Sequence, residues 1–313
     1  MLFSSPLFVF LFLPVVLALY FVLPRRARNL WLLAASLLFY AWGEKLIVAI
    51  MLASITANYA FGLWVERARR GGSARHVIAW ATVFNIGLLV AFKYADWLWS
   101  IASFALVSLG LVDTPLHALG SWVPADSPWR EILLTPAGGI RLPIGISFFT
   151  FQAFSYVLDV YRRDTEVQRN PFDFALYVTL FPQLIAGPIV RYKDVAAEIV
   201  QRSTTEHGFA SGVRRFVIGL GKKMLVANIV AKAADGIFAI PAGELPTSVA
   251  WLGIVCYTLQ IYFDFSAYSD MAIGLGRMFG FHFLENFAHP YVSRSITEFW
   301  RRWHISLSTW FRD

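Results

Sequence analysis

Long apolar runs separated by short polar segments extend along the whole sequence. Residues 7–23, 46–65 and 249–265 are such runs, and each approaches the length of about 20 residues that a helix needs to cross a bilayer. Residues 77–111 are long enough for two spans or for one long tilted helix. The pattern predicts an all-α, polytopic transmembrane protein with roughly seven to nine crossings in one membrane-embedded domain.

One apolar segment, residues 174–190, differs from the others because Pro182, Gly187 and Pro188 interrupt it. Proline inside a helix removes a backbone hydrogen bond and clashes with the preceding turn. Backbone that leaves a helix at membrane depth must be buried in protein or line a wet cavity. We therefore expect a re-entrant or kinked segment here, and interfacial helices beside the spanning ones.

Composition supports a membrane location, since 58% of the 313 residues are hydrophobic and 15% are charged. Soluble domains carry about 25% charged residues. The net charge of +7 could indicate nucleic acid, but the basic residues lie in short segments beside apolar runs. Such segments face the cytoplasm under the positive-inside rule, so the expected partner is the lipid bilayer and no nucleic acid. The main clusters are Arg25, Arg26 and Arg28; Arg67, Arg69, Arg70 and Arg75; and Arg162 and Arg163.

The last segment predicts a helix that begins near Ile296, because Ser295 and Glu298 have the spacing of a capping box. Glu298 and Arg302 are four residues apart and are expected to pair along the helix. His304 follows Trp300 by four and falls on the apolar side. The sequence reaches Asp313 without a helix stop signal, so we expect more chain beyond it. The apolar face of one continuous helix would comprise Ile296, Trp300, Trp303, Leu307 and Trp310.

Candidate chemistry rests on polar residues inside apolar sequence, since the chain has no phosphate-binding loop, no Gly-x-Ser-x-Gly elbow and no histidine pair with zinc spacing. We therefore expect no metal site. Ionisable groups within a membrane are costly and are functional candidates, here Asp264, Asp270 and His304. Asp264 is equally well explained as a buried structural carboxylate that caps a helix or pairs with Arg277. A lone histidine on an apolar face is more often a hydrogen-bonded core residue than a catalyst.

Several motifs, spread in order along the chain, also carry a family resemblance. They lie at residues 1–6, 38–42, 142–149, 184–188, 260–266 and 285–313. Together they resemble membrane-bound O-acyltransferases of the alginate O-acetylation type. The resemblance implies a multi-helix fold with the reacting groups in a funnel or tunnel through the bilayer.

The same resemblance implies an activity and its partners. Members of this family move an acyl group from a donor on the cytoplasmic side to hydroxyls of an exported polysaccharide such as alginate. The expected acyl donor is a co-substrate such as acetyl-CoA or an acyl carrier, and no cofactor stays bound. The expected location is the bacterial inner membrane as a multi-pass protein, with periplasmic polysaccharide-modifying proteins as partners.

His304 matches the first of two histidines characteristic of this family. The second, usually assigned as catalytic, stands in a Trp-His-Gly context beyond residue 313, so the sequence given would lack the principal catalytic residue and could be inactive. We therefore expect a supporting or relay role for His304, which a histidine near neutral pKa suits. The expected substrate-path residues are Asp264, Arg302, Trp300 and Trp303, with Asp264 and Arg302 as candidates for orienting His304.

Two other function classes remain open from the sequence. A transporter uses broken helices at its midplane site, but it usually has a pair of them in two similar halves, and only one is present here. A non-catalytic membrane scaffold of a polysaccharide export or modification complex is the second alternative. Substitution of His304 separates the acyltransferase from a scaffold, because a scaffold should tolerate the change.

Overall fold

The computed structural model describes the chain except residues 73, 115, 125, 128, 129, 136, 137, 186 and 313, and except the side chains of 70, 131 and 132. In the described residues helices dominate and no β-strand forms, although Leu134 and Ile140 make an isolated bridge. The predicted all-α class is therefore confirmed. The chain divides into two compact units, Met1–Leu32 with Leu180–Asp313, and Leu33–Thr179. The prediction of one domain stays a prediction.

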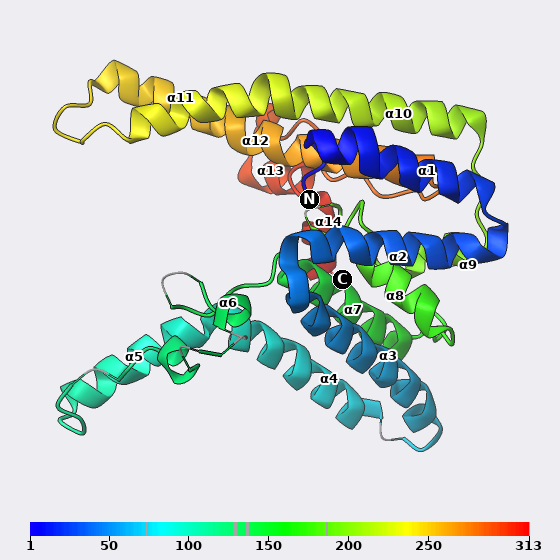
Figure 1. Cartoon of the computed structure of the whole chain (residues 1–313), viewed down its shortest axis with the longest axis horizontal. Helices are drawn as coiled ribbons and strands as arrows, with labels where there is room; N and C mark the ends of the chain where they lie inside the picture. Colours follow the sequence, from blue (N-terminus) through cyan, green and yellow to red (C-terminus); the bar gives the residue numbers. More distant parts are fainter. Residues whose placement is uncertain are drawn as a thin grey trace. The chain divides into compact units, whose positions relative to one another are not determined.

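The middle unit, Leu33–Thr179, is built on three helices packed against one another, α3 (Val48–Arg70), α4 (Ala74–Leu89) and α7 (Ile146–Arg162) (Figure 1). A buried amide pair joins two of them, because the side chains of Asn58 and Asn85 donate to each other at 3.1 and 2.9 Å. The other elements are the end of α2 (Arg25–Glu44), η2 (Lys45–Ile47), η3 (Val90–Tyr94), α5 (Ala95–Ser108), η4 (Leu119–Trp122), α6 (Arg130–Leu133) and α8 (Pro171–Thr179).

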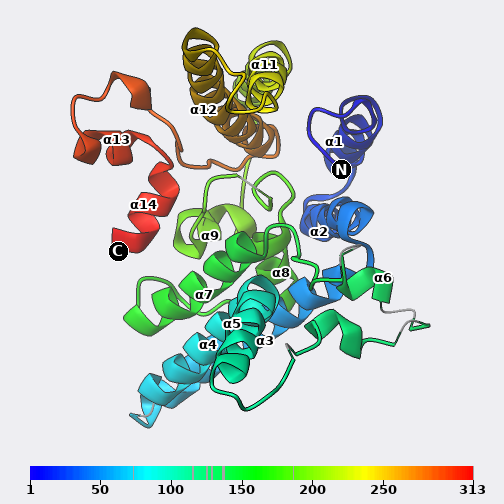
Figure 2. The same ribbon diagram turned by 90° about the vertical axis from the view of Figure 1, so that its left-hand side faces the viewer.

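The other unit is organised around a helical hairpin. Helix α10 (Glu206–Gly221), the π-helical η5 (Lys222–Ala227) and α11 (Asn228–Phe238) follow one another directly and pack along α12 (Thr247–Met278). Figure 2 shows α11 and α12 side by side. The remaining elements are η1 (Phe8–Phe12), α1 (Leu13–Val22), α9 (Tyr192–Val200), η6 (Pro290–Val292), α13 (Ile296–Arg302) and α14 (Ile305–Arg312).

Glycines allow α10 and α12 to approach closely. A Cβ added at Gly212 would lie 2.6 Å from the carbonyl oxygen of Gly274, and one added at Gly274 would lie 2.6 Å from the amide nitrogen of Phe216. Gly219 meets the carbonyl oxygen of Ala267 in the same way, at 2.8 Å. Small residues at such contacts are typical of helix pairs in membranes, where packing replaces the hydrophobic effect.

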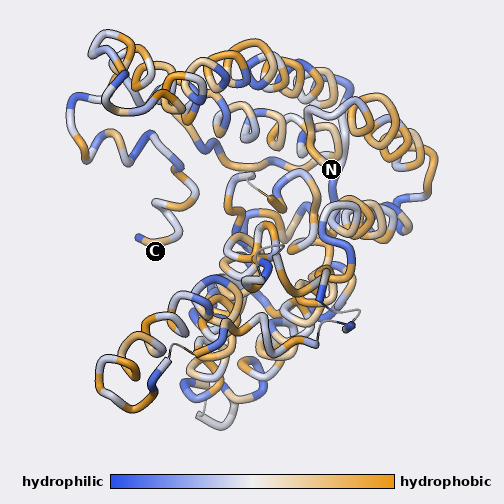
Figure 3. The backbone as a smooth tube through the Cα atoms, turned by 60° about the vertical axis from the view of Figure 1, so that its left-hand side comes forward, coloured by the Kyte–Doolittle hydropathy of each residue, from blue (hydrophilic) through white to orange (hydrophobic). Residues whose placement is uncertain are grey.

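Three helices in the described part of the chain are long and apolar enough to cross a membrane: Arg25–Arg69, Ala74–Ser108 and Thr247–Met278. The predicted run 7–23 forms a shorter apolar helix, Phe8–Val22. Apolar positions recur along nearly all the helices (Figure 3). The chain is thus an all-α membrane protein, while the number of crossings stays a prediction.

The helix boundaries refine the predicted segments. Residues 77–108 belong to one long helix, Ala74–Ser108, because α4, η3 and α5 are continuous through a π-helical turn. The basic residues between positions 67 and 75 lie where α3 ends at Arg70 and α4 begins at Ala74. Farther along the chain, α9 and α10 are amphipathic, so one face of each packs while the other stays accessible.

The predicted interruption within residues 174–190 is confirmed. Helix α8 ends at Thr179 and α9 begins at Tyr192, and the described residues between them are not helical. Most of them are buried, including Phe181, Leu184 and Val190. Gly187 is required here, because an added Cβ would lie 2.5 Å from the Cα atom of Gln183. Other parts of the protein therefore surround the non-helical backbone between α8 and α9, as expected for irregular backbone in a membrane protein.

Candidate functional site

His304 lies in a sharp turn between two short helices, α13 and α14. The predicted start of α13 is confirmed, because the Ser295 side chain accepts a hydrogen bond from the amide of Glu298 at 3.1 Å. The predicted continuous helix from Ile296 to Trp310 is wrong, since α13 ends at Arg302 and the next residue is extended. His304 itself has a left-handed backbone with φ 45°.

A nearby loop explains this interruption. The amide of Ala288 donates to the carbonyl of Arg302 at 2.9 Å, and the amide of Ile305 donates to the carbonyl of Asn286 at 3.0 Å. Each of these bonds engages a backbone group that would form a hydrogen bond within the helix if the helix were continuous. The loop around 286–288 therefore competes with helix formation at residues 302–305 and positions His304 between the two helices.

A buried polar network holds this turn in place. The Oδ1 atom of Asn286 accepts hydrogen bonds from the Ser306 amide and hydroxyl, at 3.3 and 2.9 Å. Its Nδ2 atom donates to the Ser269 hydroxyl on α12 at 3.1 Å, and Ser306 in turn accepts from the Ile189 amide at 3.0 Å. Asn286, Ser269 and Ser306 are all buried. The network thus ties the His304 turn to α12 and to the irregular segment before α9.

Sequence reasoning did not single out Asn286, Ser269 or Ser306. Asn286 lies in the motif at 285–313, and Ser306 follows His304 by two residues, so the motif was the available signal. Nothing in the local pattern links these residues to Ser269, which is 17 residues before Asn286.

The imidazole of His304 is buried, with 8% of the residue exposed. The ring of Phe265 packs edge-on against it with centroids 4.8 Å apart. His304 lies outside the three candidate spans. Burial lowers the pKa of His304 to about 4, so the imidazole is neutral at pH 7 and can accept a proton. A left-handed backbone at a non-glycine residue is strained, and such strain concentrates at functional sites.

The two predicted tryptophans occupy different environments. Trp303 packs within an aromatic cluster, with centroids 5.1 Å from Phe287 and 5.5 Å from Phe299. Tyr262 of α12 and Tyr291 also contact Trp303, each at 6.2 Å. Trp300 is 53% exposed and packs edge-on against Phe299. Trp303 therefore lies with the buried turn, whereas Trp300 faces outward.

Asp264 is neither buried nor paired with Arg277, so that structural alternative is wrong. Its carboxylate lies 2.6 Å from the Lys223 ammonium, and its side chain is 47% exposed. Arg277 donates instead to the Ser211 hydroxyl at 3.1 Å. The reason is geometric. Lys223 lies on η5, and η5 packs against α12, the helix that carries Asp264.

Arg302 forms the predicted ion pair with Glu298, at 2.9 Å. It also donates to the carbonyl of Ala288 at 3.2 Å, which strengthens the attachment of the loop to α13. The backbone amide of Arg294 and the Arg302 guanidinium donate to Glu298 and lower the pKa of that carboxyl. That Asp264 and Arg302 orient His304 stays a prediction.

A second charged cluster joins α10, η5 and α12. Asp270 accepts from the Arg215 guanidinium at 2.9 Å and from the Lys222 ammonium at 2.6 Å. Arg215 also binds Glu285, the residue before Asn286. Asp270, a candidate from the sequence, thus balances two cations beside the polar network that holds His304.

Comparison with known proteins gives a consistent result. Residues 162–313 match the profile of a family described as MBOAT, membrane-bound O-acyltransferase family. The whole chain is 46% identical to a probable alginate O-acetylase of Azotobacter vinelandii and to one of Pseudomonas aeruginosa, covering 58% and 56% of those proteins. It is 34% identical to a peptidoglycan O-acetyltransferase of Helicobacter pylori, over 60% of that protein. The chain therefore spans less than two thirds of the length of these relatives.

Proposed function

We propose that this chain belongs to the membrane-bound O-acyltransferase family and forms part of an enzyme that transfers an acetyl group to hydroxyls of an exported polysaccharide. One observation carries the proposal. The chain places a buried, neutral histidine in a strained turn, held by hydrogen bonds from Ser306 to Asn286, inside the region that matches the family. Buried ionisable groups with specific support are candidates for catalytic sites.

The proposed reaction moves one acetyl group and one proton. An acceptor hydroxyl oxygen attacks the carbonyl carbon of an acetyl thioester, the new C–O bond forms, and the C–S bond breaks. The hydroxyl proton passes to a base and then to the departing thiolate. A general base works best with a pKa near the working pH, and a pKa of about 4 is low for that task. This supports a relay or supporting role for His304.

Apolar surroundings suit such a reaction. The Phe265 ring beside His304 and the aromatic cluster around Trp303 limit the access of water. Exclusion of water protects an acyl donor from hydrolysis. Asp264, Arg302, Trp300 and Trp303 are proposed to line the substrate path, with Trp300 the most accessible of the two tryptophans.

The names of the relatives support the proposed acceptor, whereas the donor and the exact location are part of the proposal. Relatives named alginate O-acetylase and peptidoglycan O-acetyltransferase support a polysaccharide acceptor, with alginate favoured by the higher identity. The proposed donor is acetyl-CoA or an acyl carrier on the cytoplasmic side. The chain would span the bacterial inner membrane several times and act with periplasmic polysaccharide-modifying proteins.

The test is substitution of His304 in the protein produced by its own gene. We expect His304→Ala to lower the O-acetyl content of the exported polysaccharide at least tenfold, since acid–base groups contribute about 10²–10⁴-fold. His76→Ala is the matched control, because His76 is exposed and lies in the other unit. Membrane abundance is measured for each variant. Normal acetylation by His304→Ala at normal abundance would remove the site role and favour a scaffold.

A further inference from the structure

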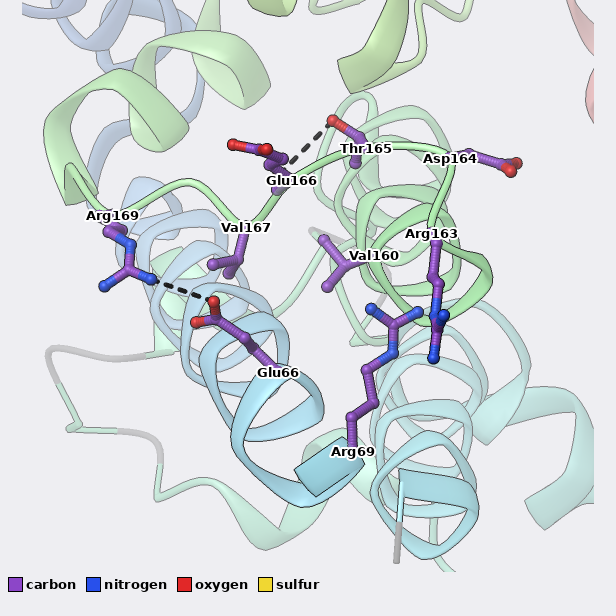
Figure 4. Close-up of a pocket in the computed structure, with 9 residues that line it drawn as sticks. All are labelled: Glu66, Arg69, Val160, Arg163, Asp164, Thr165, Glu166, Val167 and Arg169. Atoms are coloured by element: carbon purple, nitrogen blue, oxygen red, sulfur yellow. Dashed lines mark hydrogen bonds and ion pairs between the residues drawn. The ribbon is translucent and has the colours of Figure 1, made fainter. Parts of the chain in front are cut away.

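A polar pocket opens in the middle unit, where helices α3 and α7 end (Figure 4). Its volume is about 620 Å³, which is within the usual range of small-molecule sites. The two helix ends carry arginine clusters that were expected to face the cytoplasm. The lining residues are Glu66, Arg69, Val160, Arg163, Asp164, Thr165, Glu166, Val167 and Arg169.

Arg163 occupies a backbone position where glycine is usual. It follows the last residue of α7 with φ 69° and ψ 25°, which is left-handed. The amide of Asp164 donates to the Asp159 carbonyl and that of Arg163 to the Val160 carbonyl, as in a Schellman motif. A left-handed conformation costs a non-glycine residue about 1–2 kcal/mol. Arg163 thus adopts its backbone conformation at an energetic cost, and its side chain lines the pocket.

Three arginines and three carboxylates line the pocket, but they do not all pair with one another. Arg169 is already paired with Glu66 at 3.0 Å, and Arg69 donates to the carbonyl of Tyr161. Within the part of the chain that the structure describes, no hydrogen bond or ion pair engages the Arg163 side chain. Arg69 and Arg163 both line the pocket, and in Figure 4 the carboxylates of Asp164 and Glu166 lie apart from their guanidinium groups.

Two guanidinium groups that line one pocket favour the binding of an anion, because each carries a positive charge. Guanidinium presents a planar set of donors that matches a phosphate group with two parallel hydrogen bonds. A carboxylate of the chain could also supply the negative charge. Of the three in the pocket, however, Glu66 binds Arg169, and those of Asp164 and Glu166 lie apart from Arg69 and Arg163. The geometry therefore leaves a place for an external anion.

We infer that this pocket binds a phosphate ester, with Arg163 and Arg69 as its ligands. The chemistry fits two sources: the phosphates of an acyl donor such as coenzyme A, or the head group of an anionic phospholipid at the membrane surface. The first source rests on the proposed function, since it requires an acyl donor on that side of the membrane. A binding measurement without acetyl transfer keeps the two questions separate.

The test uses the purified membrane protein in nanodiscs of neutral lipid. Coenzyme A is titrated by calorimetry, with inorganic pyrophosphate as competitor. Arg163→Gly removes the charge and also relieves the left-handed strain, so the fold should be at least as stable while binding weakens. We expect a loss in affinity of at least about tenfold, because hydrogen bonds to charged groups are the strong ones. Arg67→Ala is the control, since it removes one exposed arginine of α3 outside the pocket.

The second arm replaces part of the neutral lipid with phosphatidylglycerol, and native mass spectrometry measures the lipid retained. Weaker coenzyme A binding by Arg163→Gly, with unchanged lipid retention, assigns the pocket to the acyl donor. Unchanged coenzyme A binding with lost phosphatidylglycerol assigns it to the lipid. If Arg163→Gly matches Arg67→Ala in both arms, the inference is overturned. Coenzyme A binding that survives His304→Ala would show that failure of acetyl transfer leaves this site intact.

Discussion

Replacement of Asn286 by alanine tests the network that positions His304. Asn286 is fully buried and makes three side-chain hydrogen bonds, two from Ser306 and one to Ser269. Alanine removes all three and leaves polar groups of both serines buried with fewer partners. Each lost hydrogen bond costs about 1 kcal/mol, so the expected loss is about 3 kcal/mol. The backbone bonds at residues 302–305 would remain but would lose their support.

The assay has two readouts. The midpoint temperature of thermal unfolding of the purified variant should fall by on the order of 5 °C, because 1 kcal/mol shifts the midpoint by a few degrees in a chain of this size. O-acetylation should fall further than stability alone explains, measured at a temperature where the variant is folded. Ser269→Ala removes one bond of the network and should have a smaller effect on both readouts.

Asn228→Ala is the matched control, since within the described residues the Asn228 amide makes a single side-chain hydrogen bond, to the Met224 sulfur at 3.5 Å, at the start of α11. It should change the midpoint by less than about 1 °C. If Asn286→Ala melts and acetylates like Asn228→Ala, the network does not hold His304 and the argument for a positioned histidine fails. If stability falls but acetylation per folded molecule is unchanged, Asn286 has a structural role alone.

Three further predictions follow from the structure. Gly274→Leu should separate α10 from α12 and destabilise the protein by about 2 kcal/mol, whereas Gly236→Ala, which meets no atom within 4 Å, should be neutral or stabilising in the same melting assay. Asp270→Asn should cost about 2 kcal/mol because it leaves two cations without their shared carboxylate, and added salt should reduce the loss. Because of His304, the free energy of unfolding should decrease by up to about 3 kcal/mol as the pH falls from 6.5 to 4, since the unfolded histidine binds a proton more readily than the buried one. The melting midpoint of His304→Gln should lack this pH dependence.

The local and compositional features were predictable from the sequence. Apolar runs indicated a helical membrane protein, and the prolines at 182 and 188 indicated the break before α9. Ser295 marked the start of α13, and Glu298 with Arg302 formed the expected pair. These features depend on residues within a few positions of one another, where backbone geometry alone sets the distances.

The arrangement around His304 required the fold. The turn exists because the Ala288 amide donates to the Arg302 carbonyl and the Asn286 carbonyl accepts from the Ile305 amide, and no local signal marks that competition. The structural alternative for Asp264 was a pair with Arg277, but its carboxylate contacts Lys223, 41 residues away in sequence.

The sequence therefore determined what the chain is made of: apolar helices, their interruption, and a histidine on an apolar side. Tertiary contacts determined how that histidine is held, which cation meets which carboxylate, and where Arg163 lies relative to Arg69. The physical reason is that helix formation and membrane partition are governed by short stretches of chain, whereas hydrogen bonds in a site join residues whose separation only packing defines.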